Sequence, residues 1–263
     1  MEISKATFKS VKLQDIQKRM EAAQKSKKIN FLIYGRSGTG KTLAAATAPP
    51  PVLLHSFDPG GWKSVQEEID AGKVIFDDRF EQEEVDGKLC YDAWEAEFNA
   101  LAKDGAFEEL GTYVIDSGTF FLQALLDKVV HEAQYKPGSK RQKGDLIPEL
   151  QDYNRQQTAA LNILRNILNI PCNVIMTGHA DIYVDESDGK VHGSLLATKG
   201  LQRKIPSLFD EMYLTQVKAT SKGKEYQLLV NNDGKFEART RIGRRAFDPI
   251  EKPNISNLIK KGS

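Results

Sequence analysis

Residues 30–42 read NFLIYGRSGTGKT. The part from Gly35 to Thr42 fits G-x-x-x-x-G-K-[ST], the pattern of a phosphate-binding loop. The apolar run before the loop predicts a buried strand, and the alanine-rich residues 42–48 after it predict the start of a helix. A strand, a glycine-rich loop and a helix in this order predict an α/β fold that binds phosphate at a helix N-terminus.

The residue types of this loop each serve the binding of a nucleotide. Its glycines let consecutive backbone N–H groups turn toward phosphate oxygens. The alternative interpretation of the motif is a glycine-rich turn that binds no ligand. Lys41 adds a positive charge toward the β- and γ-phosphates, and the Thr42 hydroxyl is placed to bind Mg²⁺. The predicted nucleotide-binding residues are Gly35, Arg36, Ser37, Gly38, Thr39, Gly40, Lys41 and Thr42.

Length and composition limit the class of protein. The 263 residues suffice for one large α/β domain or two small ones. Because 37 Lys and Arg balance 36 Asp and Glu, any attraction to nucleic acid must come from local patches. No apolar run approaches the ~20 residues of a membrane span, and MEISKATFKS at the start lacks a signal-peptide core. Two cysteines without metal-ligand spacing fit a reducing compartment, so we expect a soluble, cytoplasmic protein that binds no membrane.

Short apolar runs alternate with helical patterns from residue 29 onward, which is typical of a parallel sheet with crossover helices. We expect strands at 29–34, 52–56, 112–116 and 173–177, and helices at 41–47, 91–102, 120–134 and 150–169. The turn signals at 188–189 and 232–234 predict antiparallel hairpins after His179. We divide the chain into an N-terminal arm (1–28), a core (29–250) and a C-terminal tail (251–263).

The N-terminal arm carries apolar residues at helical spacing. Val11, Leu13, Ile16 and Met20 predict an amphipathic helix over residues 12–23. This helix either packs on the flank of the domain or docks on a neighbouring subunit.

Polar residues at the ends of three predicted strands complete a candidate catalytic site. Asp116 would hold the metal through water at the carboxyl edge of the sheet, and its alternative role is a helix N-cap. Asp58 would polarise the attacking water, unless it belongs to an ordinary Asp-Pro-Gly turn. Thr177 or His179 would bind the γ-phosphate, with a plain loop residue as the alternative for the histidine. The candidate catalytic residues are Lys41, Asp58, Asp116 and His179, and the candidate metal ligands are Thr42 and Asp116.

Four segments follow one another in the order YGRSGTGKT, LLHSFDPGG, YVIDS and VIMTGHAD. With them the chain resembles the RecA-like P-loop ATPases, and among these the phage-encoded nucleotide-binding proteins that include RecA-like single-strand annealing proteins. The resemblance covers about residues 29–250. It implies a RecA-like core with a mainly parallel central sheet flanked by helices, an N-terminal helix and a C-terminal antiparallel β extension.

The resemblance also implies a cofactor and a catalytic acid. ATP and Mg²⁺ would bind at the loop together with Asp116, and Asp58 would be the catalytic carboxylate. RecA-like recombinases usually carry Glu at that second position. Because Asp58 is one methylene shorter, we expect slow hydrolysis.

Two loops of RecA-like recombinases bind single-stranded DNA, and residues 136–144 and 181–200 are the matching segments here. Cationic loops follow the phosphates of a single strand, and the flanking Tyr135 and Tyr183 are candidates to stack on bases. The alternative is a pair of solvated surface loops. The candidate DNA contacts are Lys136, Lys140, Arg141, Lys143, Lys190 and Lys199.

A basic cluster, RTRIGRR, occupies residues 239–245. In RecA-like filaments a cation of one subunit reaches the γ-phosphate held by its neighbour. Arg239 and Arg241 are candidates for this role, because alternate residues of a strand share a face. A DNA-binding patch, or an edge strand protected by charge, would show the same pattern of basic residues. The cluster leads us to expect a homo-oligomer or filament.

The predicted function is that of an ATP-binding RecA-like protein that acts on single-stranded DNA in phage-type recombination or single-strand annealing. We expect a slow, DNA-stimulated ATPase, whose nucleotide state is linked to DNA binding and oligomerisation. Expected partners are single-stranded DNA, further copies of the chain and a single-stranded-DNA-binding protein, in the host cytoplasm if the gene is phage-encoded. The main alternative is a nucleotide-dependent switch that recruits a replication, recombination or packaging protein without touching DNA. A P-loop kinase is a further alternative, for which residues 136–144 would form a poor lid.

Overall fold

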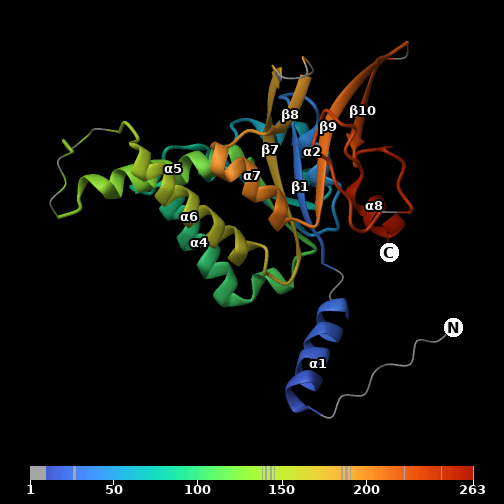
Figure 1. The fold of residues 1–263 in the computed structure, drawn as a ribbon, viewed down its shortest axis with the longest axis horizontal. Coiled ribbons are helices and arrows are strands. Elements are labelled where there is room, and N and C mark those ends of the chain that lie inside the picture. Colours follow the sequence, from blue (N-terminus) through green and yellow to red (C-terminus); the bar gives the residue numbers. More distant parts are fainter. Residues whose placement is uncertain are drawn as a thin grey trace.

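A nine-stranded, mainly parallel sheet forms the centre of the computed structural model (Figure 1). The structure describes residues 10–25, 28–137, 139, 141–142, 144, 146–184, 186, 189, 191–221, 223–243 and 245–262. The strands are β1 (Asn30–Gly35), β2 (Val52–Ser56), β3 (Val74–Asp77), β6 (Thr112–Asp116), β7 (Asn173–Val184), β8 (Val191–Leu195), β9 (Glu211–Thr220), β10 (Gly223–Leu229) and β11 (Ile250–Glu251). Their order is β11-β10-β9-β1-β7-β6-β2-β3, with β8 paired to β7. Strands β8, β10 and β11 pair antiparallel with their neighbours, and the other pairs are parallel.

Helices cover both faces of this sheet. They are α2 (Lys41–Ala46), α3 (Gln66–Asp70), α4 (Cys90–Asp104), α5 (Gly118–Gln134), α6 (Leu150–Ile167), α7 (Lys199–Leu208) and α8 (Ile255–Gly262). A further helix, α1 (Val11–Lys25), precedes the first strand. Three 3₁₀ turns, η1 (Gly61–Ser64), η2 (Arg79–Glu81) and η3 (Ala106–Glu108), and a small β4 (Glu84–Val85) and β5 (Lys88–Leu89) pair complete the chain. No helix in the described part of the chain is both long and apolar enough to cross a membrane.

Two apolar cores lie on the two faces of the sheet, because successive strand residues point to opposite sides. In β1, Leu32 and Tyr34 belong to the core that α4–α7 cover, whereas Phe31 and Ile33 belong to the second core. The fold class expected from the sequence is therefore confirmed: an α/β domain with a mainly parallel sheet, an N-terminal helix and antiparallel strands toward the C-terminus.

The second core is closed by α8, within the segment expected to be a tail. Ile255 and Leu258 are fully buried and join the cluster that contains Ala45 and Ala46 of α2. The backbone N–H of Ile255 donates to Thr47 Oγ1 at 2.9 Å, which fixes the start of α8 at the end of α2.

The turn at residues 232–234 does not form the expected hairpin. Asn232 and Asp233 do make a turn, in which their side chains accept hydrogen bonds from the N–H groups of Gly234, Lys235 and Phe236. Directly after it the described chain joins the sheet through single bridges, Gly193 to Phe236 and Met212 to Arg239, before β11 pairs with β10. After His179, the described residues form antiparallel pairs of consecutive strands at β7–β8 and β9–β10.

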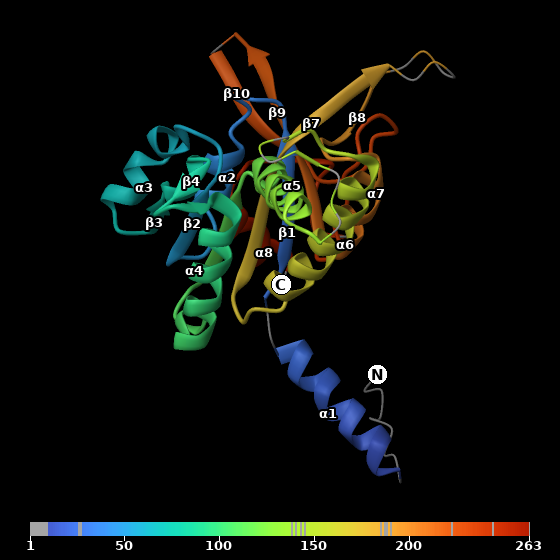
Figure 2. The same ribbon diagram turned by 90° about the vertical axis from the view of Figure 1, so that its left-hand side faces the viewer.

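Helix α1 stands away from the core in both views (Figures 1 and 2). Its side chains Leu13, Ile16 and Met20 are 44%, 60% and 52% exposed. The expected packing of this helix on the flank of the domain is therefore not what the structure shows.

A buried chain of hydrogen bonds crosses the larger core at β2. Trp94 Nε1 donates to the Tyr113 hydroxyl at 2.9 Å, and this hydroxyl is hydrogen-bonded to His55 Nδ1, also at 2.9 Å. Burial lowers the pKa of His55 to about 4, and Asp77 opposes this shift only in part.

The lowered pKa of His55 leads us to expect that the protein loses stability in acid. Its pKa is lower in the folded than in the unfolded chain, so its contribution is full above pH 6.5 and is lost as the pH falls toward 4. The loss amounts to about 3 kcal/mol. We expect His55→Gln to show a smaller decrease in the free energy of unfolding than the wild type when urea denaturation is repeated at pH 7 and pH 4.5. Identical decreases in the two proteins would contradict this prediction.

Candidate nucleotide-binding site

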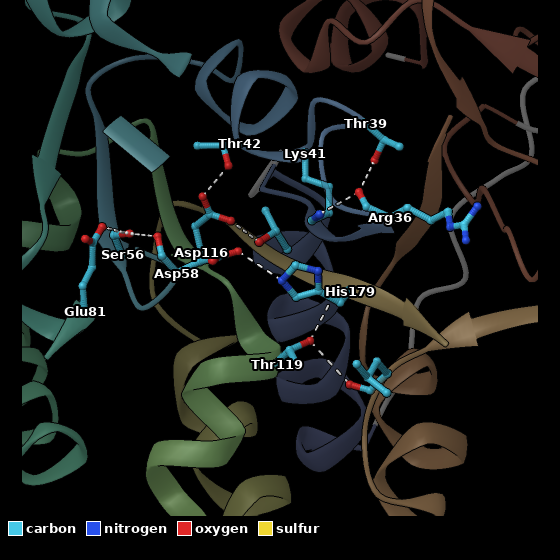
Figure 3. Close-up of polar contacts among 12 residues, drawn as sticks. Arg36, Thr39, Lys41, Thr42, Ser56, Asp58, Glu81, Asp116, Thr119 and His179 are labelled. Carbon is cyan, nitrogen blue, oxygen red and sulfur yellow. Dashed lines mark hydrogen bonds and ion pairs between the residues drawn. The ribbon is translucent and has the colours of Figure 1, made fainter. Parts of the chain in front are cut away.

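The loop between β1 and α2 lies at the carboxyl edge of the sheet (Figure 3). Gly40 has φ 85°, a left-handed conformation that favours glycine. A Cβ on Gly35 would lie 2.1 Å from Thr215 Oγ1 on β9, so this position has no room for a side chain. Thr39 Oγ1 donates to the Arg36 carbonyl at 2.6 Å and lies 2.6 Å from Thr215 Oγ1. The loop is thus held in shape by its own residues and by β9.

Lys41 lies inside the curve of this loop and is only 7% exposed. Its ammonium donates to the Arg36 carbonyl at 3.1 Å, which uses one of its three N–H donors. Burial lowers the pKa of Lys41, and the carboxylates of Asp116 and Asp58 oppose this shift. A charged donor beside a helix N-terminus suits a polyphosphate.

Asp116 and Thr42 form an oxygen-rich pair beside the loop. Thr42 Oγ1 donates to Asp116 Oδ2 at 2.6 Å, and Thr177 Oγ1 donates to Asp116 Oδ1. Asp116 is 1% exposed, and its burial raises the pKa of this carboxyl. A hard cation that is held by one carboxylate, one hydroxyl and the phosphates themselves fits this donor set. The predicted metal ligands Thr42 and Asp116 therefore lie together and suit Mg²⁺.

The other two candidates come together from the loop after β2 and from the middle of β7, which extends beyond the expected end at residue 177 to Val184. Asp58 Oδ2 lies 3.1 Å from His179 Nε2, and both side chains are partly exposed. The backbone N–H groups of Phe57 and Asp58 donate to the Asp116 carbonyl, so the end of β2 is fixed to the end of β6. The structure thus places Lys41, Asp58, Asp116 and His179 along one edge, as the parallel strands require.

Glu81 is a further acid at this edge that the sequence analysis missed. It accepts a hydrogen bond from Ser56 Oγ at 2.7 Å (Figure 3). It also accepts one from the Gly60 N–H at 3.2 Å. It follows the edge strand β3, whose short VIFD run was not recognised as a strand. Tyr226 of β10 was also missed: its ring lies 3.1 Å from where a Cβ on Gly40 would be.

The candidate DNA contacts divide into three groups. Lys136 and Lys199 are exposed, whereas Lys140, Lys143 and Lys190 lie outside the residues that the structure describes. Arg141 is only 9% exposed, and its guanidinium lies 2.5 Å from Asp152 and 3.0 Å from Glu149. Because the carboxylate of Asp152 is buried at the start of α6, Arg141 neutralises it there and is not available to DNA.

The candidate cations for a neighbouring subunit both bind groups of their own chain. Arg239 Nη2 donates to the carbonyls of Pro206 and Phe209 at the end of α7, at 2.7 and 2.8 Å. Arg241 Nη1 instead donates to Asp210 at 3.1 Å. The expected strand does not form there, since Arg239 makes only an isolated bridge, and both guanidinium groups have partners within the chain.

A family model covers the part of the chain that contains this site. The AAA domain family (AAA_24) matches residues 27–242. Among solved structures, a KaiC-like protein of Pyrococcus horikoshii is similar, with 14% identity, a TM-score of 0.42 and coverage of 78% of both chains. The flagellar accessory protein FlaH of Methanocaldococcus jannaschii is similar with 9% identity and a TM-score of 0.41, over 84% of this chain and 83% of that one. A comparison with curated proteins finds no match. Since the family match spans most of the chain and includes the loop, Lys41 and Asp116, the chain belongs to the AAA domain family and is a P-loop NTPase.

Proposed function

We propose that this protein is an Mg²⁺-dependent, RecA-like ATPase that acts on single-stranded DNA in phage-type recombination or strand annealing. Its nucleotide state would be linked to DNA binding and to self-association. One observation carries the proposal: β7 runs without interruption from His179, which contacts Asp58, to Tyr183 in an exposed hairpin.

The β7–β8 hairpin projects beyond the carboxyl edge of the sheet (Figure 2). Tyr183 is 48% exposed, and its ring stacks on His192 with a centroid distance of 6.0 Å. Exposed ring faces accept nucleobases without selecting a sequence, which suits a protein that follows a single strand. Any movement of His179 on nucleotide binding is carried along the same strand to Tyr183.

The residues at the edge have separate roles in hydrolysis. Lys41 and the loop N–H groups bind the phosphates, and Thr42 and Asp116 would hold Mg²⁺, which offsets the charge that develops on the phosphates. Asp58 polarises the attacking water, and His179 orients this carboxylate through the 3.1 Å contact. Because Asp58 is short and already engaged, turnover is slow.

Tyr183→Ala is expected to weaken the binding of single-stranded DNA about 10-fold, because one stacked base contributes ~1 to 3 kcal/mol. The measurement is fluorescence anisotropy of a labelled oligonucleotide, with and without ATP and Mg²⁺. The matched control is Tyr153→Ala, which removes an exposed tyrosine of α6 outside both candidate loops and should leave DNA affinity unchanged. Equal DNA affinity of Tyr183→Ala and the wild type would exclude the hairpin as a DNA contact.

A protein-recruiting switch remains the second candidate, because Val184 and Val191 of the same hairpin are 61% and 44% exposed. Exposed apolar side chains favour a protein partner over a phosphate backbone. Salt separates the two functions: contacts to phosphates give a steep decrease of log K with log salt, whereas an apolar interface does not. No DNA binding in any nucleotide state would favour the switch.

A further inference from the structure

Helix α1 presents an apolar face that its own domain does not cover. Leu13, Ile16 and Met20 stand at positions i, i+3 and i+7, so they share one side of the helix, and all three are exposed. Lys12 and Arg19 border this face at the same seven-residue spacing. Such a helix is suited to a groove that is apolar at its floor and acidic at its rim.

The larger core opens into a groove of that kind. It has a volume of about 530 Å³ and lies beside α5, next to the catalytic edge. Phe57, Phe80 and Phe120 contribute aromatic side chains, and Leu146 adds an apolar side chain that is 66% exposed. The acids of the groove are Glu81, Glu83, Glu84 and Asp127.

We propose that α1 of one copy of this chain docks in this groove of a second copy. The three apolar side chains of α1 would pack on Phe120 and Leu146, above the buried Phe57 and Phe80, and Lys12 and Arg19 would meet Glu83, Glu84 and Asp127. Phe120 and Leu146 are exposed in a single copy, as are the apolar side chains of α1, and the two surfaces carry opposite charges.

The positions of helix and groove favour a neighbour over the same copy. α1 precedes β1 and leaves the core at the amino edge of the sheet, pointing away from it (Figures 1 and 2). The groove lies at the opposite edge, since Phe57 precedes Asp58 and Glu81 accepts from the Gly60 N–H. A contact between opposite ends of one molecule is heterologous, so it repeats from copy to copy into a ring or an open chain.

This contact would also reach the catalytic edge. Glu81 of η2 lines the groove and also accepts hydrogen bonds from Ser56 and Gly60, which flank Asp58. A docked α1 from a neighbour therefore restricts the loop after β2. This deepens the self-association in the proposed function, but it requires neither nucleotide nor DNA.

Sedimentation equilibrium of the full chain, without nucleotide or DNA, tests the proposal. We expect the wild type to self-associate, and Ile16→Asp to raise the dissociation constant at least ~10-fold, because a charge replaces a central apolar anchor. Val11→Asp is the matched control, since Val11 is 70% exposed on the opposite side of the same helix. It should leave the dissociation constant unchanged.

A charge exchange tests the partner surface itself. Reversing Lys12 and Arg19 to Glu, or Glu83 and Glu84 to Lys, should each weaken association, and combining all four changes should restore it. Mixing an Ile16→Cys variant with a Glu84→Cys variant should give a cross-linked pair of chains, because the native Cys90 and Cys172 are buried.

Three results would overturn the proposal. They are a wild type that stays monomeric at all concentrations, charge reversals that leave the dissociation constant unchanged, and a mixture of Ile16→Cys and Glu84→Cys chains that gives no cross-linked pair. Nucleotide and DNA binding are measured on Ile16→Asp in parallel. Loss of association with both ligands still bound supports docking, whereas failure to bind the ligands in the wild type bears only on the proposed function.

Discussion

Replacing Lys41 by Ala is expected to weaken nucleotide binding at least ~100-fold, which is a loss of about 2.7 kcal/mol or more. Its ammonium is the buried cation of the loop and lies close enough to Asp116 and Asp58 to influence both carboxylates. Without it, a polyphosphate at the loop would face these carboxylates with no side chain between them to balance the charge. Isothermal titration with ATP and Mg²⁺ measures the effect.

The control for this variant is Lys63→Ala, which removes an exposed lysine of η1 close to the site. It should bind nucleotide like the wild type. Circular dichroism should show that Lys41→Ala keeps its fold, because within the described residues its ammonium donates only to the Arg36 carbonyl. Unchanged affinity in Lys41→Ala would show that the loop is not the nucleotide site.

Replacing Asp58 by Asn is expected to lower kcat about 100-fold, while the affinity for nucleotide changes less than about 3-fold. The amide keeps the size of the side chain and its contact with His179, but it cannot take a proton from water. Steady-state hydrolysis and nucleotide titration on the same preparation separate the two effects.

Glu81→Gln provides the comparison, because Glu81 is the other acid at this edge. Its carboxylate is occupied by Ser56 and the Gly60 N–H, so we expect only a few-fold decrease in kcat through displacement of the loop. If Glu81→Gln abolishes hydrolysis and Asp58→Asn does not, the catalytic carboxylate is Glu81.

Local sequence was sufficient to predict those elements whose structure depends on a single strand or loop. The expected strands at 52–56 and 112–116 have the observed bounds, since buried apolar runs between turn signals leave little choice. The phosphate loop and the acids at strand ends were also found, because parallel strands place their carboxyl ends at one edge.

Partners that are distant in the chain could not be predicted. Arg141 looks like a cation of a basic loop, and only the tertiary structure shows that Asp152 and Glu149 bind it. Arg239 contacts carbonyls of Pro206 and Phe209, about 30 residues earlier, and a sequence pattern holds no information on such pairs. The position of Glu81 at the catalytic edge was missed for the same reason, because its partners Ser56 and Gly60 lie at the end of a different strand, β2.

The position of α8 has a consequence for how the protein is made. The apolar side of α2 forms early in synthesis, but Ile255 and Leu258, which cover it, are added more than 200 residues later. The ribosome releases the chain from its N-terminus onward, so the second core stays open to water and to proteases until residues 255–258 have been synthesised. A nascent chain that stalls before residue 255 therefore exposes the apolar side chains of the second core. Such a chain is expected to be bound by a chaperone or degraded.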